Sequence, residues 1–127
     1  MEAHPHLLIV EHDPAIADLF VLALSEEGYG VDAVLTPEDA LDRLNEHGRE
    51  HYSVVLSNPF SDHRREQYAW LDRIVERTTG AVVICSRHPA TFFSDHRARG
   101  FAAFLQEPFN LQDLVNLVAS LTNGHGE

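Results

Sequence analysis

Polar side chains of types that can do chemistry follow four short apolar runs of the chain. The four groups are Glu11-His12-Asp13, Asn58-Pro59, Ser86-Arg87 and Glu107-Pro108. A histidine among carboxylates can hold a proton or bind a metal softer than magnesium, and a carboxylate can act as an oxygen nucleophile, whereas a neutral amide cannot. The sequence has no Ser-His-Asp or Cys-His order with a nucleophile turn, so a hydrolase has no support. We therefore expect a polar pocket in a protein that is not an enzyme.

The elements that must position these groups follow from the hydrophobic pattern, whose period alternates between that of strands and that of helices. Buried strands are expected at residues 7–10, 31–35, 53–57, 81–85 and 101–105. Helices are expected after Asp13, after Thr36, around residues 71–75, over residues 91–99 and after Asn110. Such alternation predicts a parallel sheet covered on both faces, with its ligand site at the carboxyl ends of the strands. The four polar groups would meet there.

The composition limits the chemistry and the partners. Asp and Glu number 20 and Lys and Arg number 9, which gives a net charge of -11, and such a chain repels nucleic acids and anionic membranes. All nine basic residues are arginine, which excludes lysine-dependent chemistry, and the one cysteine, Cys85, excludes an intrachain disulfide or a cysteine-based zinc cluster. The sequence shows no apolar run of membrane-spanning length and no signal-peptide pattern. We expect a cytoplasmic protein with no nucleic-acid or membrane partner.

Three segments resemble the CheY-like receiver domain of response regulators, which act in two-component phosphorelay signal transduction. Residues 8–16 (LIVEHDPAI) resemble its opening, residues 52–58 (YSVVLSN) its third strand and the next position, and residues 100–109 (GFAAFLQEPF) its fifth strand and cis-proline turn. The resemblance implies a three-layer, flavodoxin-like α/β fold with a five-stranded parallel sheet in the order 2-1-3-4-5. It also implies that residues 1–127 form a single receiver domain with its core at about 6–121.

The resemblance places the family's acidic pocket at Glu11, His12 and Asp13. Glu11 keeps the first acid, His12 stands where the second acid belongs, and Asp13 is expected to act as a helix cap in preference to a metal ligand. Because Mg²⁺ prefers oxygen ligands, we expect its binding to be weak or absent. Asn58 falls on the phosphoacceptor position, and its amide cannot form an acyl phosphate. Shifting the alignment by one residue puts Ser57 there, but strand alternation would direct that side chain to the other face.

The positions that respond to phosphorylation in the family are only partly kept. Ser86 matches the hydroxyl switch position and Phe104 the aromatic one, although these residues could equally be a loop cap and a core or interface phenylalanine. Glu107 stands where the family has a lysine, so a bound phosphate would meet repulsion instead of a salt bridge. The resemblance implies a cis bond before Pro108.

Two further features have both functional and purely structural interpretations. His47 and His51 are four apart, but Gly48 interrupts that helix and no third zinc ligand is apparent, so we expect solvent-exposed histidines and assign no metal site. For His12, charge compensation is favoured over a pH-sensing role, and metal binding comes last. Phe92 and Phe93 are candidate interface anchors, because two adjacent residues of a helix cannot both face the core, and one of them would be exposed.

These observations lead to one functional hypothesis and two alternatives. Because the metal acid, the acceptor and the lysine are lost together, we expect a degenerate pseudo-receiver that acts as a phosphorylation-independent protein-interaction module. Its partners would be signalling proteins or a second copy. The resemblance implies binding through the face made by residues 91–99, residues 101–105 and the helix after Asn110. The alternatives are a phosphorylatable receiver with an atypical acceptor and a flavodoxin-like small-ligand binder. The acidic, proline-blocked turn after the first strand disfavours the latter.

Overall fold

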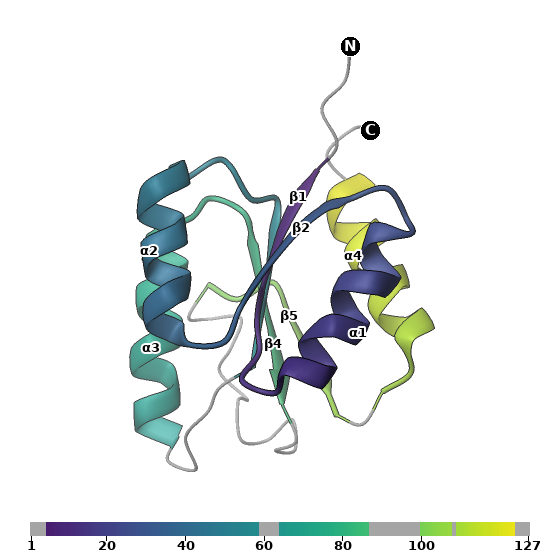
Figure 1. Cartoon of the computed structure of the whole chain (residues 1–127). Coiled ribbons are helices and arrows are strands. Elements are labelled where there is room, and N and C mark those ends of the chain that lie inside the picture. Colours follow the sequence, from purple (N-terminus) through teal and green to yellow (C-terminus); the bar gives the residue numbers. More distant parts are fainter. Residues whose placement is uncertain (1–4, 59–63, 87–99, 108, 124–127) are drawn as a thin grey trace.

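Strands and helices alternate along most of the chain (Figure 1). The computed structural model describes residues 5–58, 64–86, 100–107 and 109–123 of the 127. The strands are β1 (His6–Val10), β2 (Gly30–Val34), β3 (Val54–Ser57), β4 (Ala81–Ser86) and β5 (Ala103–Gln106). The helices are α1 (Pro14–Ser25), α2 (Pro37–His47), α3 (Arg64–Glu76) and α4 (Leu111–Asn123). The helix predicted over residues 91–99 lies outside the described residues.

The five strands form one parallel sheet in the order β2-β1-β3-β4-β5. Helices α2 and α3 cover one face of this sheet, and α1 and α4 cover the other (Figure 1). The predicted three-layer fold and strand order are therefore confirmed. Among the described residues, every helix is too short or too polar to cross a lipid bilayer.

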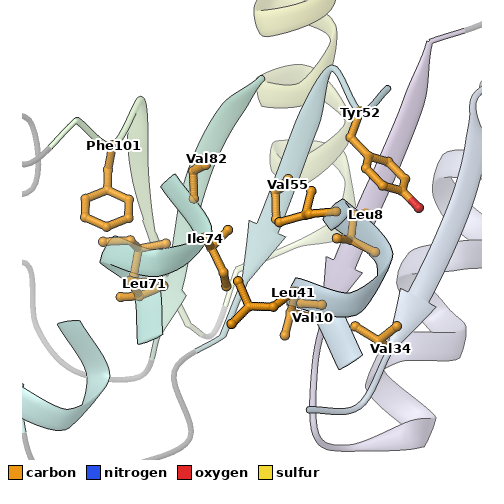
Figure 2. Close-up of a cluster of buried hydrophobic side chains, with 13 residues drawn as sticks. Leu8, Val10, Val34, Leu41, Tyr52, Val55, Leu71, Ile74, Val82 and Phe101 are labelled. Carbon is orange, nitrogen blue, oxygen red and sulfur yellow. The ribbon is translucent and has the colours of Figure 1, made fainter. Parts of the chain in front are cut away.

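The core is divided by the sheet into two clusters, because successive side chains of a strand point to opposite faces. In β1, Leu8 and Val10 pack toward α2 and α3, whereas Leu7 and Ile9 pack toward α1 and α4. Figure 2 shows the first cluster, which includes Leu8, Val10, Val34, Leu41, Tyr52, Val55, Leu71, Ile74, Val82 and Phe101. Burial on both faces explains why the central strands read as continuous apolar runs.

Polar caps start three of the helices, as the sequence predicts. Asp13 Oδ1 accepts a hydrogen bond from the Ala15 amide at 3.0 Å, and Thr36 Oγ1 accepts one from the Asp39 amide at 3.1 Å. Asn110 Oδ1 accepts one from the Asp113 amide at 2.8 Å, next to the start of α4. These caps satisfy N–H groups that have no partner within the helix. They thereby fix where the chain turns from each strand end into the next helix.

Candidate functional site

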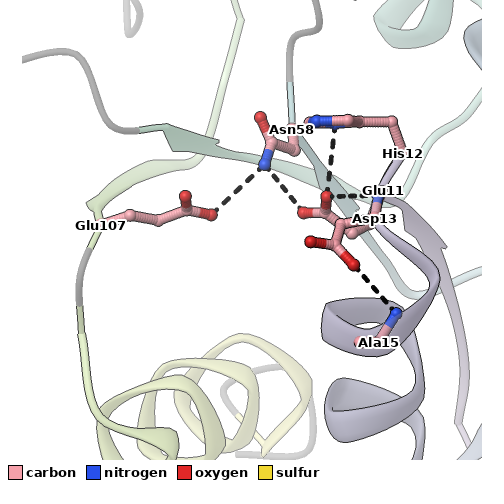
Figure 3. Close-up of polar contacts among 6 residues, drawn as sticks. All are labelled: Glu11, His12, Asp13, Ala15, Asn58 and Glu107. Atoms are coloured by element: carbon pink, nitrogen blue, oxygen red, sulfur yellow. Dashed lines mark hydrogen bonds and ion pairs between the residues drawn. The ribbon is translucent and has the colours of Figure 1, made fainter.

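Three of the predicted site residues directly follow parallel strands and so lie at the same edge of the sheet. Glu11 follows β1, Asn58 follows β3 and Glu107 follows β5. Each extends the sheet by one backbone hydrogen bond to the neighbouring strand: the amides of Glu11, Asn58 and Glu107 donate to carbonyls at 3.0, 2.9 and 2.7 Å, respectively. Their Cα positions are therefore set by the sheet, and their side chains converge beyond the strand ends (Figure 3).

The Asn58 side-chain amide links two carboxylates. Its Nδ2 donates to Glu11 Oε1 at 2.8 Å and to Glu107 Oε2 at 3.3 Å. An ionised carboxylate only accepts hydrogen bonds, so these two neighbours fix the NH₂ group toward them. The amide therefore separates two negative charges and gives each a donor, which an aspartate in its place would not do.

Glu11 is the buried centre of the site, with a side chain that is 1% exposed. Besides the Asn58 bond, its Oε2 accepts from the Asp13 backbone amide at 3.0 Å and lies 3.3 Å from His12 Nδ1. Burying a carboxylate is costly unless it is hydrogen-bonded or paired. The donors around Glu11 offset that cost, and both of its oxygens are engaged. The His12 side chain is 57% exposed and lies at the rim.

Asp13 lies beside Glu11 in the sequence, and its side chain caps the N-terminus of α1. Its Oδ1 caps α1 at the Ala15 amide, and Pro14 occupies the first helical position. The structure thus places this carboxylate in the capping role that the sequence favoured.

The two residues at the family's switch positions lie on β4 and β5. Ser86 is buried at the last position of β4, and its carbonyl accepts from the Glu107 amide. Phe104 is partly buried and packs against the cluster on the α2 and α3 side. Pro108 and the candidate interface residues Phe92 and Phe93 lie outside the described residues.

Cys85 lies near the site, although the sequence offered no reason to place it there. It is buried at the penultimate position of β4. Burial raises the pKa of its thiol, and the carboxylates of Glu107 and Glu11 raise it further. The sulfur is therefore kept as a neutral thiol, which is not a nucleophile.

Sequence reasoning also missed that the changes at residues 58 and 107 are complementary. Taken separately, they are the loss of an acceptor carboxylate and the loss of a cation. In the structure, the Asn58 amide is a donor and the Glu107 carboxylate is its acceptor. The sequence held a signal for this pair. Residue 58 is a hydrogen-bond donor where the family has a carboxylate, residue 107 is a carboxylate where the family has a donor, and both follow strands that end at the same edge of the sheet.

The sequence matches no protein-family model and no curated protein, whereas solved structures match it over nearly its whole length. A response regulator from Thermotoga maritima is 20% identical, with a TM-score of 0.80 over 94% of this chain and 98% of that one. A two-component response regulator from Clostridium difficile is 18% identical, with a TM-score of 0.84 over 98% and 100%. A CheY-like receiver domain protein from Methanospirillum hungatei JF-1 is 20% identical, with a TM-score of 0.81 over 98% of each chain. With its strand order and layers, the chain has the fold of CheY-like response-regulator receiver domains.

Proposed function

We propose that this chain is a degenerate receiver domain of two-component signalling that works through protein contacts and without phosphoryl transfer. The observation that carries the proposal is the Asn58 amide bridge between Glu11 and Glu107. The bridge occupies the edge of the sheet where ligands of such folds bind. The fold alone does not assign a function, and the chemistry of these three side chains is what distinguishes this chain from a phosphorylatable receiver.

The bridge disfavours phosphoryl transfer in two ways. The Asn58 nitrogen donates hydrogen bonds and is no nucleophile toward phosphorus. A phosphoryl group on this residue would also bring anionic oxygens next to the Glu11 and Glu107 carboxylates. Two like charges 4 Å apart repel by about 4 kcal/mol at an effective dielectric constant of 20. With Glu107 in place of a cation, that repulsion has no compensating salt bridge.

The Mg²⁺ that the fold family implies does not fit the donors present. Both Glu11 oxygens already accept hydrogen bonds, Asp13 Oδ1 caps α1, and His12 offers nitrogen where this cation prefers oxygen. We therefore infer that Mg²⁺ binds weakly or not at all, and no step of the proposed function passes through it.

The test is incubation with a small phosphodonor and Mg²⁺, followed by intact-mass spectrometry. We expect no phosphoryl adduct on the wild-type chain. The matched control is the triple variant His12→Asp, Asn58→Asp, Glu107→Lys, which restores the acid, the acceptor and the cation and should gain one phosphoryl group. A stable adduct on the wild-type chain would refute the proposal and favour an atypical acceptor.

A flavodoxin-like ligand binder is less well supported. Such a site needs free backbone N–H groups at the start of the first helix to bind a phosphate. Here the Asp13 carboxylate already accepts from the Ala15 amide, and Pro14 has no N–H group. An anion would have to displace a carboxylate of like charge.

Protein contacts are the remaining output for a receiver of this kind. In the described part of the chain, α1 exposes Leu19 and Leu22, which are three residues apart and so lie on the same side of the helix. Phe92 and Phe93 stay candidates from sequence for contact with a signalling protein or a second copy. Sedimentation of the wild type and of the double variant Phe92→Ala, Phe93→Ala tests whether the chain binds a second copy of itself. We expect the wild type to form a dimer and the double variant to dimerise more weakly. A wild type that is monomeric at all concentrations would exclude this dimer.

A further inference from the structure

A second polar cluster lies on the α2 side of the sheet, where α2 ends and the chain returns toward β3. It consists of Asp32 in β2, His47 at the end of α2 and His51 in the loop before β3. One carboxylate oxygen and one nitrogen from each imidazole all lie within 4.8 Å of one another. Helix α2 leads away from the carboxyl end of β2, so its C-terminal end, where His47 is the last residue, lies opposite the carboxyl ends of the strands (Figure 1).

Aromatic packing holds the two imidazoles side by side. Their rings stack with centroids 4.4 Å apart and planes inclined by 17°. The buried ring of Tyr52 meets both rings edge to face, at 6.0 Å from His47 and 4.7 Å from His51. Two imidazoles are thus gathered at one place, although the His47 side chain is exposed.

The carboxylate of the cluster is oriented by the same tyrosine. Tyr52 donates its hydroxyl to Asp32 Oδ2 at 2.6 Å, and Arg43 lies 3.7 Å from the same oxygen. Neither contact uses Asp32 Oδ1. A ligating carboxylate whose second oxygen accepts a hydrogen bond is the usual arrangement at protein metal sites, where such partners fix the ligand and tune its basicity.

Two histidines and one aspartate are a donor set suited to zinc, which takes imidazole nitrogen and carboxylate oxygen and completes a tetrahedron with water. Ligand atoms of a tetrahedral zinc site are about 3.3 Å apart, given zinc–nitrogen distances of ~2.0–2.1 Å. To aim both nitrogens at one ion, the exposed His47 ring has to turn out of its stack with His51.

We propose that Asp32, His47 and His51 form a binding site for Zn²⁺, with Tyr52 as the residue that positions Asp32. His6, whose ring centroid lies 4.7 Å from that of His51, borders the site. The proposal is independent of the phosphorylation chemistry at Asn58, since it uses different residues on a different part of the sheet.

The test is a zinc titration of the full chain in competition with a chromophoric chelator. We expect wild-type binding at micromolar concentration or tighter, and at least 10-fold weaker binding by His47→Ala, His51→Ala and Asp32→Asn. Tyr52→Phe keeps the ring but removes the hydroxyl, and should weaken binding by about 10-fold, as loss of such a supporting partner does. With Co²⁺ in place of zinc, the intense visible absorption of a tetrahedral complex should appear in the wild type and be lost in His47→Ala.

The control is His12→Ala, which removes a histidine that lies 3.3 Å from the Glu11 carboxylate, outside the cluster, and should leave zinc affinity unchanged. Melting curves in the presence of a chelator check that each variant folds. Since His47 is exposed, its replacement keeps the test decisive if Asp32→Asn does not fold. Wild-type binding weaker than millimolar, or an affinity unchanged in His47→Ala, would overturn the proposal and leave the cluster as a packing feature.

Discussion

The bridge at Asn58 makes a sharp prediction for Asn58→Asp, a change of one side-chain group at constant size. The substitution removes two hydrogen bonds to carboxylates, which contribute about 1.5–3 kcal/mol each. It also places a third carboxylate where Nδ2 now lies, 2.8 Å from one Glu11 oxygen and 3.3 Å from one Glu107 oxygen. At an effective dielectric constant of 20, the upper bounds on the two repulsions are about 6 and about 5 kcal/mol.

Protonation of the introduced carboxyl removes this repulsion, so its pKa should rise in the folded state. Its value in the unfolded chain stays near 3.9. A group with a raised folded-state pKa favours folding most at low pH, and this contribution is lost as pH rises through the folded-state pKa. The variant should therefore be about 3 kcal/mol or more less stable than the wild type at pH 8. The gap should narrow toward pH 5, by at most about 1.4 kcal/mol per pH unit.

The assay is urea unfolding of both proteins between pH 5 and pH 8. A matched control is Asn45→Asp, since Asn45 is an exposed residue whose Oδ1 already accepts from Arg77. That change should alter the free energy of unfolding by no more than about 0.5 kcal/mol. Adding Glu107→Lys to Asn58→Asp should recover at least about 1 kcal/mol at pH 7, as coupled neighbours do. Equal stability of the wild type and Asn58→Asp across this pH range would refute the account of the bridge.

Three further predictions test the core and the buried thiol. Leu8→Ala, at a fully buried site in β1, should cost about 2–5 kcal/mol in unfolding free energy, whereas Leu22→Ala, at 59% exposure, should stay within about 0.5 kcal/mol; equal losses would contradict the assigned layers. Gly80→Ala should lower stability by about 1–3 kcal/mol in thermal melts, because a Cβ there would collide with the Tyr52 carbonyl oxygen, and an unchanged melting temperature would contradict that packing. Cys85 should react with a thiol reagent only after unfolding, since burial raises the pKa of its thiol; rapid labelling of the native protein would be inconsistent with its place in β4.

The fold could be predicted from the sequence because burial leaves a clear periodic record. Strands β1, β3, β4 and β5 have apolar centres, and the caps at Asp13, Thr36 and Asn110 mark helix starts. The first and last residues of the strands were less predictable. Phe101 is buried, so the apolar pattern included it in the fifth strand, yet β5 begins at Ala103. Burial and strand pairing are different properties, and hydrophobicity reports only the first.

The sequence predicted which residues lie at the pocket but not the hydrogen bonds between their side chains. That Glu11, Asn58 and Glu107 share one edge follows from parallel topology. The Asn58 hydrogen bonds do not, because they depend on side-chain reach. The proximity of Asp32 to His47 and His51 was not predicted for another reason. His47 and His51 are a visible pair, but Asp32 is 15 residues before His47 on a strand, and only the packing of α2 against β2 brings it near.

The most direct test of the central claim is a nuclear magnetic resonance spectrum of the Asn58 side-chain NH₂ group, recorded while Mg²⁺ and the phosphoryl mimic beryllofluoride are added. If the amide bridges Glu11 and Glu107 and the pocket has no acceptor, the two side-chain proton signals and the backbone signals of both glutamates should not move. Saturable shifts of these signals, which would report a phosphoryl mimic bound with its metal at the strand ends, would contradict the account.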